Sequence, residues 1–129
     1  MLYEFILEDS ENRMLMFNKW ISKKIPSENY EIVHAEHVSE AKQLLFEHKW
    51  DIIFLDHDLN HKVFVDSSDY DTGFQVAKFI AENLNKIHFN KIIIHSQNPV
   101  GAGNMHSILR DAGVTQIYSI PFNSLIAHS

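Results

Sequence analysis

The stretch "DIIFLDHDL" (Asp51–Leu59) contains an apolar run that ends in three consecutive ionisable residues. The run Asp51–Leu55 is almost continuously apolar after its first residue, which is typical of a strand covered on both faces of a sheet. Asp56, His57 and Asp58 follow it directly. Two carboxylates and an imidazole are costly at the end of a buried strand unless something compensates them. We therefore expect a binding or reactive site at this strand end.

Four further runs rich in β-branched and aromatic residues also predict strands. They lie at Tyr3–Leu7, Tyr30–Ala35, Lys91–Ser96 and Gln116–Ile120. Between the strands, apolar residues recur with helical spacing. This spacing predicts helices at Glu11–Lys24, Val38–His48, Thr72–Leu84 and Gly101–Ala112. The alternation predicts an α/β fold, with a doubly wound parallel sheet of five strands and helices on both faces.

Local signals refine the ends of these elements. Ser39 is a candidate N-cap of the second helix, and Gly113 is a stop signal for the fourth. The residues after Phe122 favour no particular structure. The polar stretch 60–71, between the third strand and its helix, is either a binding loop or a solvated insertion.

Composition restricts the class of protein. The 129 residues fit one domain, 1–129, and the 45% hydrophobic and 22% charged fractions are ordinary for a soluble globular protein. A formal net charge of -6 disfavours non-specific binding to nucleic acid. The chain has no cysteine, which excludes a disulfide framework and a thiolate metal site. No stretch has the pattern of a signal peptide or a membrane span, so we expect a cytoplasmic protein that binds no membrane.

Polar residues also follow the other strands, and in doubly wound folds ligands bind outside the carboxyl ends of the strands. The first strand is followed by Glu8 and Asp9, and the fourth ends in His95 and Ser96 with Asn98 just behind. Clustered carboxylates repel one another, and a divalent cation is the simplest compensation. Oxygen ligands favour Mg²⁺ or Mn²⁺, and an imidazole ligand would also permit Zn²⁺. The alternative for each residue alone is a helix cap or a loop hydrogen bond.

These strand ends resemble the receiver domain of two-component response regulators over nearly the whole chain. That family has an acidic pair after the first strand, a phosphoacceptor Asp after the third and a hydroxyl residue after the fourth. The matching residues here are Glu8-Asp9, Asp56 and Ser96. The resemblance implies a flavodoxin-like, receiver-like fold and a magnesium site. The family's lysine–proline pair after the fifth strand reads Ile120-Pro121, so the lysine that pairs with the acyl phosphate is missing.

Four strings resemble a narrower family, the cyclic-phosphate-processing receiver domains. They are "LEDSENR" (Leu7–Arg13), "LDHDL" (Leu55–Leu59), "TG" (Thr72-Gly73) and "HSQNPVGAGNM" (His95–Met105). This resemblance implies a hydrolase, namely a phosphodiesterase that acts on the cyclic phosphate of a nucleotide or an RNA end.

The first functional hypothesis is therefore a metal-dependent phosphoesterase, with one histidine as base and one as acid. Its catalytic residues would be Asp56, His57, Asp58 and His95. Its metal ligands would be Glu8, Asp9, Asp56 and Asp58, although either histidine could be a ligand instead. Its phosphate-binding residues would be Ser96, Asn98, Gly101 and Arg13. Arg13 could equally pair with Glu8 or Asp9.

Two other hypotheses stay open. One is a receiver-type signalling domain phosphorylated on Asp56, against which Ile120 counts. The other is a non-catalytic pseudo-receiver that binds a partner or a nucleotide. The expected partner is a small-molecule or nucleotide phosphate. The sequence leaves the substrate, the metal and the oligomeric state undetermined.

Overall fold

The computed structural model describes residues 1–24, 29–59 and 66–127. The strands in these ranges are β1 (Leu2–Leu7), β2 (Tyr30–Ala35), β3 (Trp50–Leu55), β4 (Phe89–Ile94) and β5 (Ile117–Ser119). The helices are α1 (Glu11–Lys24), α2 (Val38–Leu44), α3 (Gly73–Glu82), α4 (Pro99–Asp111) and α5 (Phe122–Ala127). All neighbouring strands are parallel, and the sheet has the order β2-β1-β3-β4-β5. The predicted doubly wound α/β fold is confirmed.

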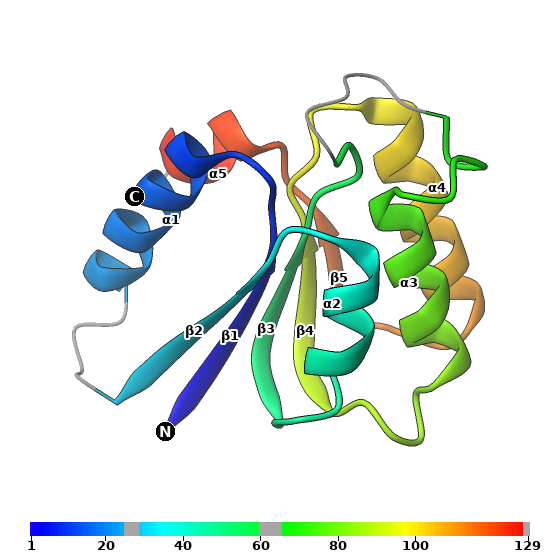
Figure 1. Ribbon diagram of the computed structural model, residues 1–129, viewed down its shortest axis with the longest axis horizontal. Coiled ribbons are helices and arrows are strands. Elements are labelled where there is room, and N and C mark those ends of the chain that lie inside the picture. The colour runs from blue at the N-terminus through cyan, green and yellow to red at the C-terminus, as the bar shows by residue number, and fades with distance from the viewer. Residues whose placement is uncertain (25–28, 60–65, 128–129) are drawn as a thin grey trace.

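Helices cover both faces of the sheet (Figure 1): α1 and α5 lie on one face, and α2, α3 and α4 on the other. Strand β3 contributes to both cores. Its Ile53 and Leu55 pack against α2, α3 and α4, whereas Phe54 packs against α1 and α5. All three side chains are fully buried, which explains the continuous apolar run in the sequence. Among the described helices, none is both long and apolar enough to cross a membrane.

Helix α2 differs from its prediction at both ends. Its N-cap is His37, whose backbone is extended (φ -130°, ψ 154°), so Ser39 lies inside the first turn and does not cap the helix. The helix ends at Leu44, not at His48, because the chain turns back there into β3.

Helix α4 begins at Pro99, two residues before the predicted start. The reason is a side-chain cap: Asn98 Oδ1 accepts a hydrogen bond of 3.0 Å from the backbone N–H of Gly101. Proline is favoured in the first turn because it has no N–H to satisfy. The helix ends at Asp111, and the predicted stop signal Gly113 follows two residues later with a φ of +105°. The short helix over 122–127 had no sequence prediction.

The stretch 60–71 is only partly described, since 60–65 lie outside the described residues. Its second half is a series of turns. Asp66 Oδ1 accepts a hydrogen bond of 2.8 Å from the N–H of Ser68, and Asp69 Oδ1 accepts one of 3.0 Å from the N–H of Asp71. The choice between a binding loop and a solvated insertion stays open.

A carboxyl group is buried in the middle of the sheet. Glu4 lies on β1 beside Ile52 of β3, and its side chain is fully buried. Burial, followed by the charge of the nearby Asp51 carboxylate, raises the pKa of Glu4 to about 8. Between its ordinary pKa and this value the folded chain holds a proton that the unfolded chain releases. The free energy of unfolding must therefore fall as the pH rises through this interval.

We predict that Glu4→Gln removes much of the pH-dependent fall in the free energy of unfolding. The free energy of unfolding of the wild type should fall between pH 5 and pH 8, by at most roughly 1.4 kcal/mol per pH unit. The variant should show a flatter dependence and be the more stable protein at pH 8. Urea unfolding at the two pH values measures both effects. Glu31→Gln on the exposed part of β2 is the matched control, and a wild-type slope in the Glu4→Gln protein would contradict the prediction.

Candidate functional site

The strand register brings three ionisable side chains into one row. Leu7 of β1 pairs with Leu55 of β3, and Leu55 pairs with Ile94 of β4. The next residue of each strand is Glu8, Asp56 and His95 respectively, and we call these three residues the strand-end row. One ligand atom from each lies within 4.8 Å of the others. All three are buried, so the predicted convergence of strand ends is observed for this part of the site.

Glu8 is the most strongly held member of the row. Its Oε1 lies 2.9 Å from His95 Nε2, and its Oε2 lies 2.9 Å from the guanidinium of Arg13. The backbone N–H of Ser10 donates a further hydrogen bond of 3.0 Å to Oε2. Burial alone would raise the pKa of Glu8, but the hydrogen bonds and charges of His95 and Arg13 outweigh it and lower the pKa to about 2. Glu8 is therefore a carboxylate at neutral pH.

Asp56 responds in the opposite direction. Burial raises its pKa to about 7, while the charges of His95 and Arg13 oppose this shift and the charge of Glu8 adds to it. Its Oδ1 accepts a hydrogen bond of 2.8 Å from the backbone N–H of His57. Its Oδ2 lies 3.5 Å from Arg13. The second oxygen therefore faces the cation.

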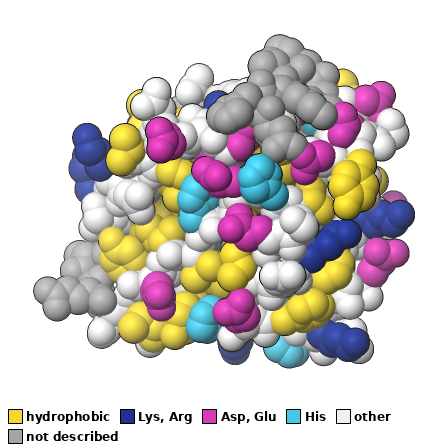
Figure 2. Space-filling model, in the orientation of Figure 1, with side chains coloured by type: hydrophobic (Ala, Val, Ile, Leu, Met, Phe, Trp, Pro, Cys, Tyr) yellow, Lys and Arg dark blue, Asp and Glu magenta, His cyan; other side chains and the backbone are white. Residues whose placement is uncertain are grey.

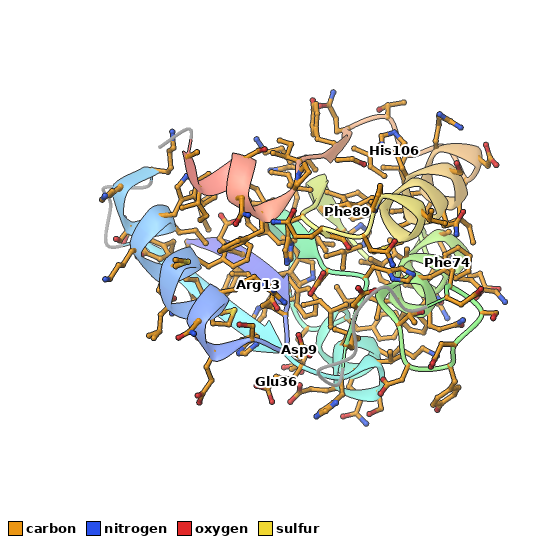
Figure 3. The ribbon with its side chains drawn as sticks, turned by 90° about the horizontal axis from the view of Figure 1, so that it is seen from above. Asp9, Arg13, Glu36, Phe74, Phe89 and His106 are labelled. Atoms are coloured by element: carbon orange, nitrogen blue, oxygen red, sulfur yellow. The ribbon has the colours of Figure 1, made fainter. Side chains whose placement is uncertain are left out.

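Arg13 is the cation that compensates the row. It reaches the site from α1, where it lies 3.6 Å from Asp9 Oδ1 (Figure 3). It also contacts Glu8 and Asp56. The sequence left open whether Arg13 binds phosphate or pairs with the acidic residues, and in this structure it pairs with them. The side chain is 35% exposed, so it can reorient toward solvent. Part of the negative charge at the strand ends is therefore compensated by a side chain of the protein itself.

The donor set of the row fits a divalent cation. Two carboxylates and one imidazole within 4.8 Å of one another are ligands suited to Mn²⁺ or Zn²⁺, and the carboxylates also suit Mg²⁺. Of the predicted ligands, Asp9 and Asp58 are not members of this group of three. In the space-filling view, acidic and histidine side chains lie side by side on the face near this end of the sheet (Figure 2).

His57 points away from the row, toward α3 and α4. Its Nδ1 lies 2.7 Å from Asp58 Oδ1, and its Nε2 lies 2.9 Å from Ser67 Oγ. Asn98 Nδ2 donates a hydrogen bond of 3.1 Å to the same oxygen of Asp58. Asn104 Nδ2 donates one of 2.8 Å to Ser67 Oγ. His57 is fully buried in this network, which joins the β3–α3 connection to α4.

Two glycines allow the close packing of the "LDHDL" segment against α3 and α4. A Cβ on Gly101 would lie 2.4 Å from Cγ of His57, so the imidazole packs directly on the helix backbone. A Cβ on Gly73 would lie 1.7 Å from the backbone oxygen of Asp56. The N–H of Gly73 also donates a hydrogen bond of 2.8 Å to the backbone oxygen of His57. The "TG" string is thus a close-packing signal, and Ser67 and Asn104 are network members that the sequence analysis did not identify.

The predicted phosphate-binding residues are partly engaged within the chain. The N–H of Gly101 donates to Asn98 Oδ1, and Ser96 Oγ accepts a hydrogen bond of 3.0 Å from the N–H of Asn98. Ser96 and Asn98 are both buried. Their role toward phosphate stays a prediction. Ile120, at the position of the missing lysine, packs against the core between α1, α5 and the sheet.

A family model described as "Cyclic-phosphate processing Receiver domain" matches residues 4–111. A search of curated proteins finds no match. Solved structures with the same fold include a Burkholderia pseudomallei response regulator with a phosphorylated aspartic acid and a calcium ion, with 14% identity and a TM-score of 0.59. The alignment covers 98% of this chain but only 65% of the Burkholderia pseudomallei protein.

Two other solved structures are covered over most of their length. The signal receiver domain of a putative Luxo repressor from Vibrio parahaemolyticus has 22% identity and a TM-score of 0.62, with 98% of this chain and 85% of that chain covered. The Mn²⁺-bound response regulator Rcp1 has 14% identity and a TM-score of 0.63, with 99% and 88% covered. At these identities the likeness establishes the fold. The family match establishes that the chain belongs to the receiver domains described as cyclic-phosphate processing.

The prediction of a metal-dependent phosphoesterase is wrong. The matched family and the similar structures are receiver domains and response regulators, one of them with a phosphorylated aspartate, and they favour the receiver hypothesis. The geometry agrees, because the imidazoles of His57 and His95 have different partners. His95 bonds to Glu8 in the row, whereas His57 bonds to Asp58 and Ser67. The two side chains do not form the acid–base pair that hydrolysis would need.

We predict that Gly101→Ala destabilises the fold, because its methyl group would overlap the buried His57 ring. Overpacking of this kind costs roughly 1–3 kcal/mol. Gly103→Ala is the matched control, since a Cβ at Gly103 meets nothing within 4 Å. The control should be neutral or gain up to about 1 kcal/mol of helix propensity.

Removal of the His57 ring tests whether the steric overlap at position 101 causes the destabilisation. In a His57→Ala background, the cost of Gly101→Ala should be smaller because the ring is gone. Chemical denaturation of the four proteins measures this coupling. Equal effects of Gly101→Ala and Gly103→Ala would contradict the packing argument.

Proposed function

We propose that this chain is a receiver-type signalling domain in which Asp56 accepts a phosphoryl group. The observation that carries the proposal is the position of the Asp56 carboxylate: it follows the central strand β3, beside the Glu8 carboxylate and 3.5 Å from the Arg13 guanidinium. Membership of the receiver domains supports it. So does the similar Burkholderia pseudomallei structure, which contains a phosphorylated aspartic acid.

The two oxygens of Asp56 have different surroundings, which favours one of them as the acceptor. Oδ1 is held by the N–H of His57, whereas Oδ2 faces Arg13. Oδ2 would attack the phosphorus atom of a donor, the new O–P bond would form, and the bond from phosphorus to the leaving group would break. The donor keeps the electron pair of that bond. Arg13 would bind the oxygens of the incoming group and balance their charge.

In this proposal Arg13 takes the part of the absent lysine. Ile120 is apolar and packs into the core, so it offers no charge to a phosphoryl group. Arg13 approaches from α1 and already contacts the acceptor. A guanidinium presents several N–H donors in a fork that fits phosphate oxygens. In this proposal the positive charge that binds the phosphoryl group therefore comes from α1 instead of from the residue that follows β5.

The strand-end row would also hold a divalent cation during the transfer. Glu8, Asp56 and His95 are the proposed ligands, with Asp9 beside them, and Mg²⁺ or Mn²⁺ are the favoured ions. Such an ion supplies charge neutralisation for the phosphate oxygens. Arg13 would have to leave Glu8 to make room, which its partial exposure permits. The proposed partner is a small-molecule phosphodonor or a phosphorylated protein. Such donors are made in the cytoplasm, so the proposal requires that the chain is located there.

We predict that acetyl phosphate with Mg²⁺ or Mn²⁺ adds one phosphoryl group to the wild type, as measured by intact-protein mass spectrometry. Asp56→Asn should not be labelled, and Asp111→Asn, an exposed carboxylate on α4, should be labelled like the wild type. Chelation of the metal should slow the reaction. The proposal fails if acetyl phosphate, carbamoyl phosphate and phosphoramidate all leave a folded, metal-supplied wild type unmodified.

The role of Arg13 is tested separately. Arg13→Gln should lower the labelling rate by roughly ten-fold or more, because a donor to the transferring group is lost. Arg13→Lys keeps the positive charge but lacks the forked arrangement of N–H donors. Its labelling rate should lie between those of the wild type and Arg13→Gln. If Arg13→Gln is labelled at the wild-type rate, Arg13 does not contact the phosphoryl group, while Asp56 can still be the acceptor.

A further inference from the structure

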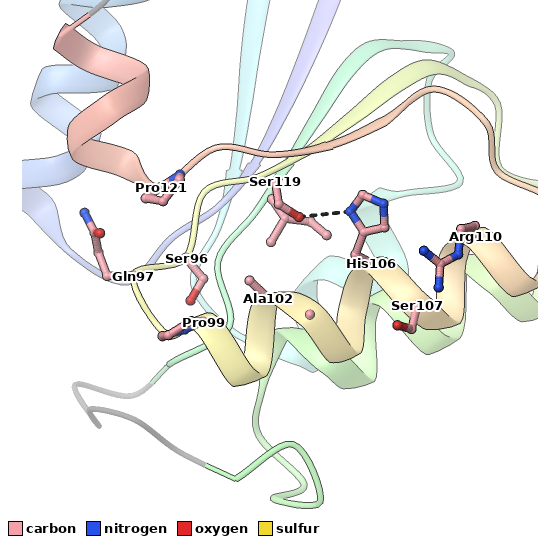
Figure 4. A pocket seen from close by; sticks show the side chains of 11 residues that line it. Ser96, Gln97, Pro99, Ala102, His106, Ser107, Arg110, Ser119 and Pro121 are labelled. Carbon is pink, nitrogen blue, oxygen red and sulfur yellow. Dashed lines mark hydrogen bonds between the residues drawn. The ribbon is translucent and has the colours of Figure 1, made fainter.

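A groove lies between α4 and β5, and Ser96 is one of the residues that line it (Figure 4). Its volume is about 550 Å³, which is within the range of small-molecule sites. The lining is mostly apolar and includes Ile94, Ala102 and Pro121. His106 Nδ1 and Ser119 Oγ form a hydrogen bond of 3.0 Å that joins the helix to the strand along the groove.

The charge of the groove is opposite to that of the chain. The protein carries 17 acidic and 11 basic residues, yet the described residues that line the groove include Arg110 and His106 and no Asp or Glu. Within the described part of the chain, no carboxylate lies within ion-pair distance of Arg110. An unpaired guanidinium beside an apolar surface favours an anionic group on the ligand.

Gly103 keeps the groove open. It lies inside α4, where glycine costs about 1 kcal/mol relative to alanine. The other three glycines have a structural reason: Gly73 packs on the backbone of Asp56, Gly101 packs on His57, and Gly113 has a positive φ. Gly103 has neither, because its φ is helical and a Cβ there meets nothing within 4 Å. The missing side chain leaves free volume at the wall of the groove, which is what a ligand would need.

We propose that this groove is a binding site for a small molecule that has an apolar ring and one anionic group. The ring would lie against Ala102 and Gly103, and the anion would pair with Arg110. The volume, the apolar lining, the basic side chains and the unexplained glycine all support the same class of ligand. The proposal does not depend on the acceptance of a phosphoryl group by Asp56.

The test uses the full chain and a matched pair of probes, naphthoate and its neutral amide naphthamide. Titration is followed in amide proton–nitrogen correlation spectra. Naphthoate should shift the amide signals of Gly103, His106 and Ser119 in a saturable manner, and should bind several-fold more tightly than naphthamide. Gly103→Leu, which fills the groove, should weaken both probes by about ten-fold or more. Arg110→Gln should remove the preference for the anion and leave the binding of naphthamide unchanged.

Controls separate the groove from other effects. Lys78→Gln removes an exposed cation from α3 and should bind naphthoate like the wild type. Asp56→Asn should also bind normally, so failure of phosphorylation and failure of groove binding can be told apart. Thermal melts confirm that Gly103→Leu is folded, and Gly103→Ala is the smaller filling variant if it is not.

Three outcomes would overturn the proposal: no saturable shifts in the wild type, shifts confined to residues outside the groove, or equal affinities of the wild type and the filled variants. Concentration-dependent shifts of the groove signals without any probe would also overturn it, because they would show that a second copy of the chain occupies this surface.

Discussion

The parallel register of β1, β3 and β4 is the constraint on which the rest of the site depends. Leu7, Leu55 and Ile94 are aligned across the sheet, so the residue that follows each of them must lie in the same row. Helices cover both faces of these strands, and the three residues of the row are buried. Buried like charges repel strongly. The Arg13 guanidinium from α1 compensates part of this charge, and His95 within the row forms a hydrogen bond with Glu8. The opposite pKa shifts of Glu8 and Asp56 follow from how closely each carboxyl group contacts Arg13 and His95.

The same strand geometry explains why Asp56 and His57 act in different places. Successive side chains at the end of a strand point to opposite faces of the sheet. Asp56 therefore turns toward α1 and Arg13, and His57 turns toward α4, where its ring rests on Gly101. A reading of "LDHDL" as one cluster overlooks this alternation. The histidine closest to Asp56 in sequence belongs to a network with Asp58 and Ser67, whereas the histidine that shares the row comes from β4.

The sequence was sufficient for the fold because hydrophobic periodicity and the strand–helix alternation are global signals, and both survive local irregularity. The acidic residues at the strand ends were predictable for the same reason. The start of α4 was not, because the cap at Asn98 is a side-chain contact that competes with the glycine signal at Gly101. The pairing of Arg13 was left open because an i,i+4 spacing allows a contact with Asp9 without requiring one. The metal roles of Asp9 and Asp58, and the phosphate role of Ser96, stay predictions.

Close packing fixes the backbone after β3 against the first turns of α3 and α4. The backbone oxygen of Asp56 rests on Gly73 at the start of α3, and the ring of His57 rests on Gly101 in the first turn of α4. Neither contact leaves room for a methyl group, so the backbone after β3 cannot shift without moving these helix ends. The helix α4 is also one wall of the groove that contains Gly103 and Arg110. The strand end that carries Asp56 and His57 and the groove are therefore both in contact with α4, although their side chains have different partners.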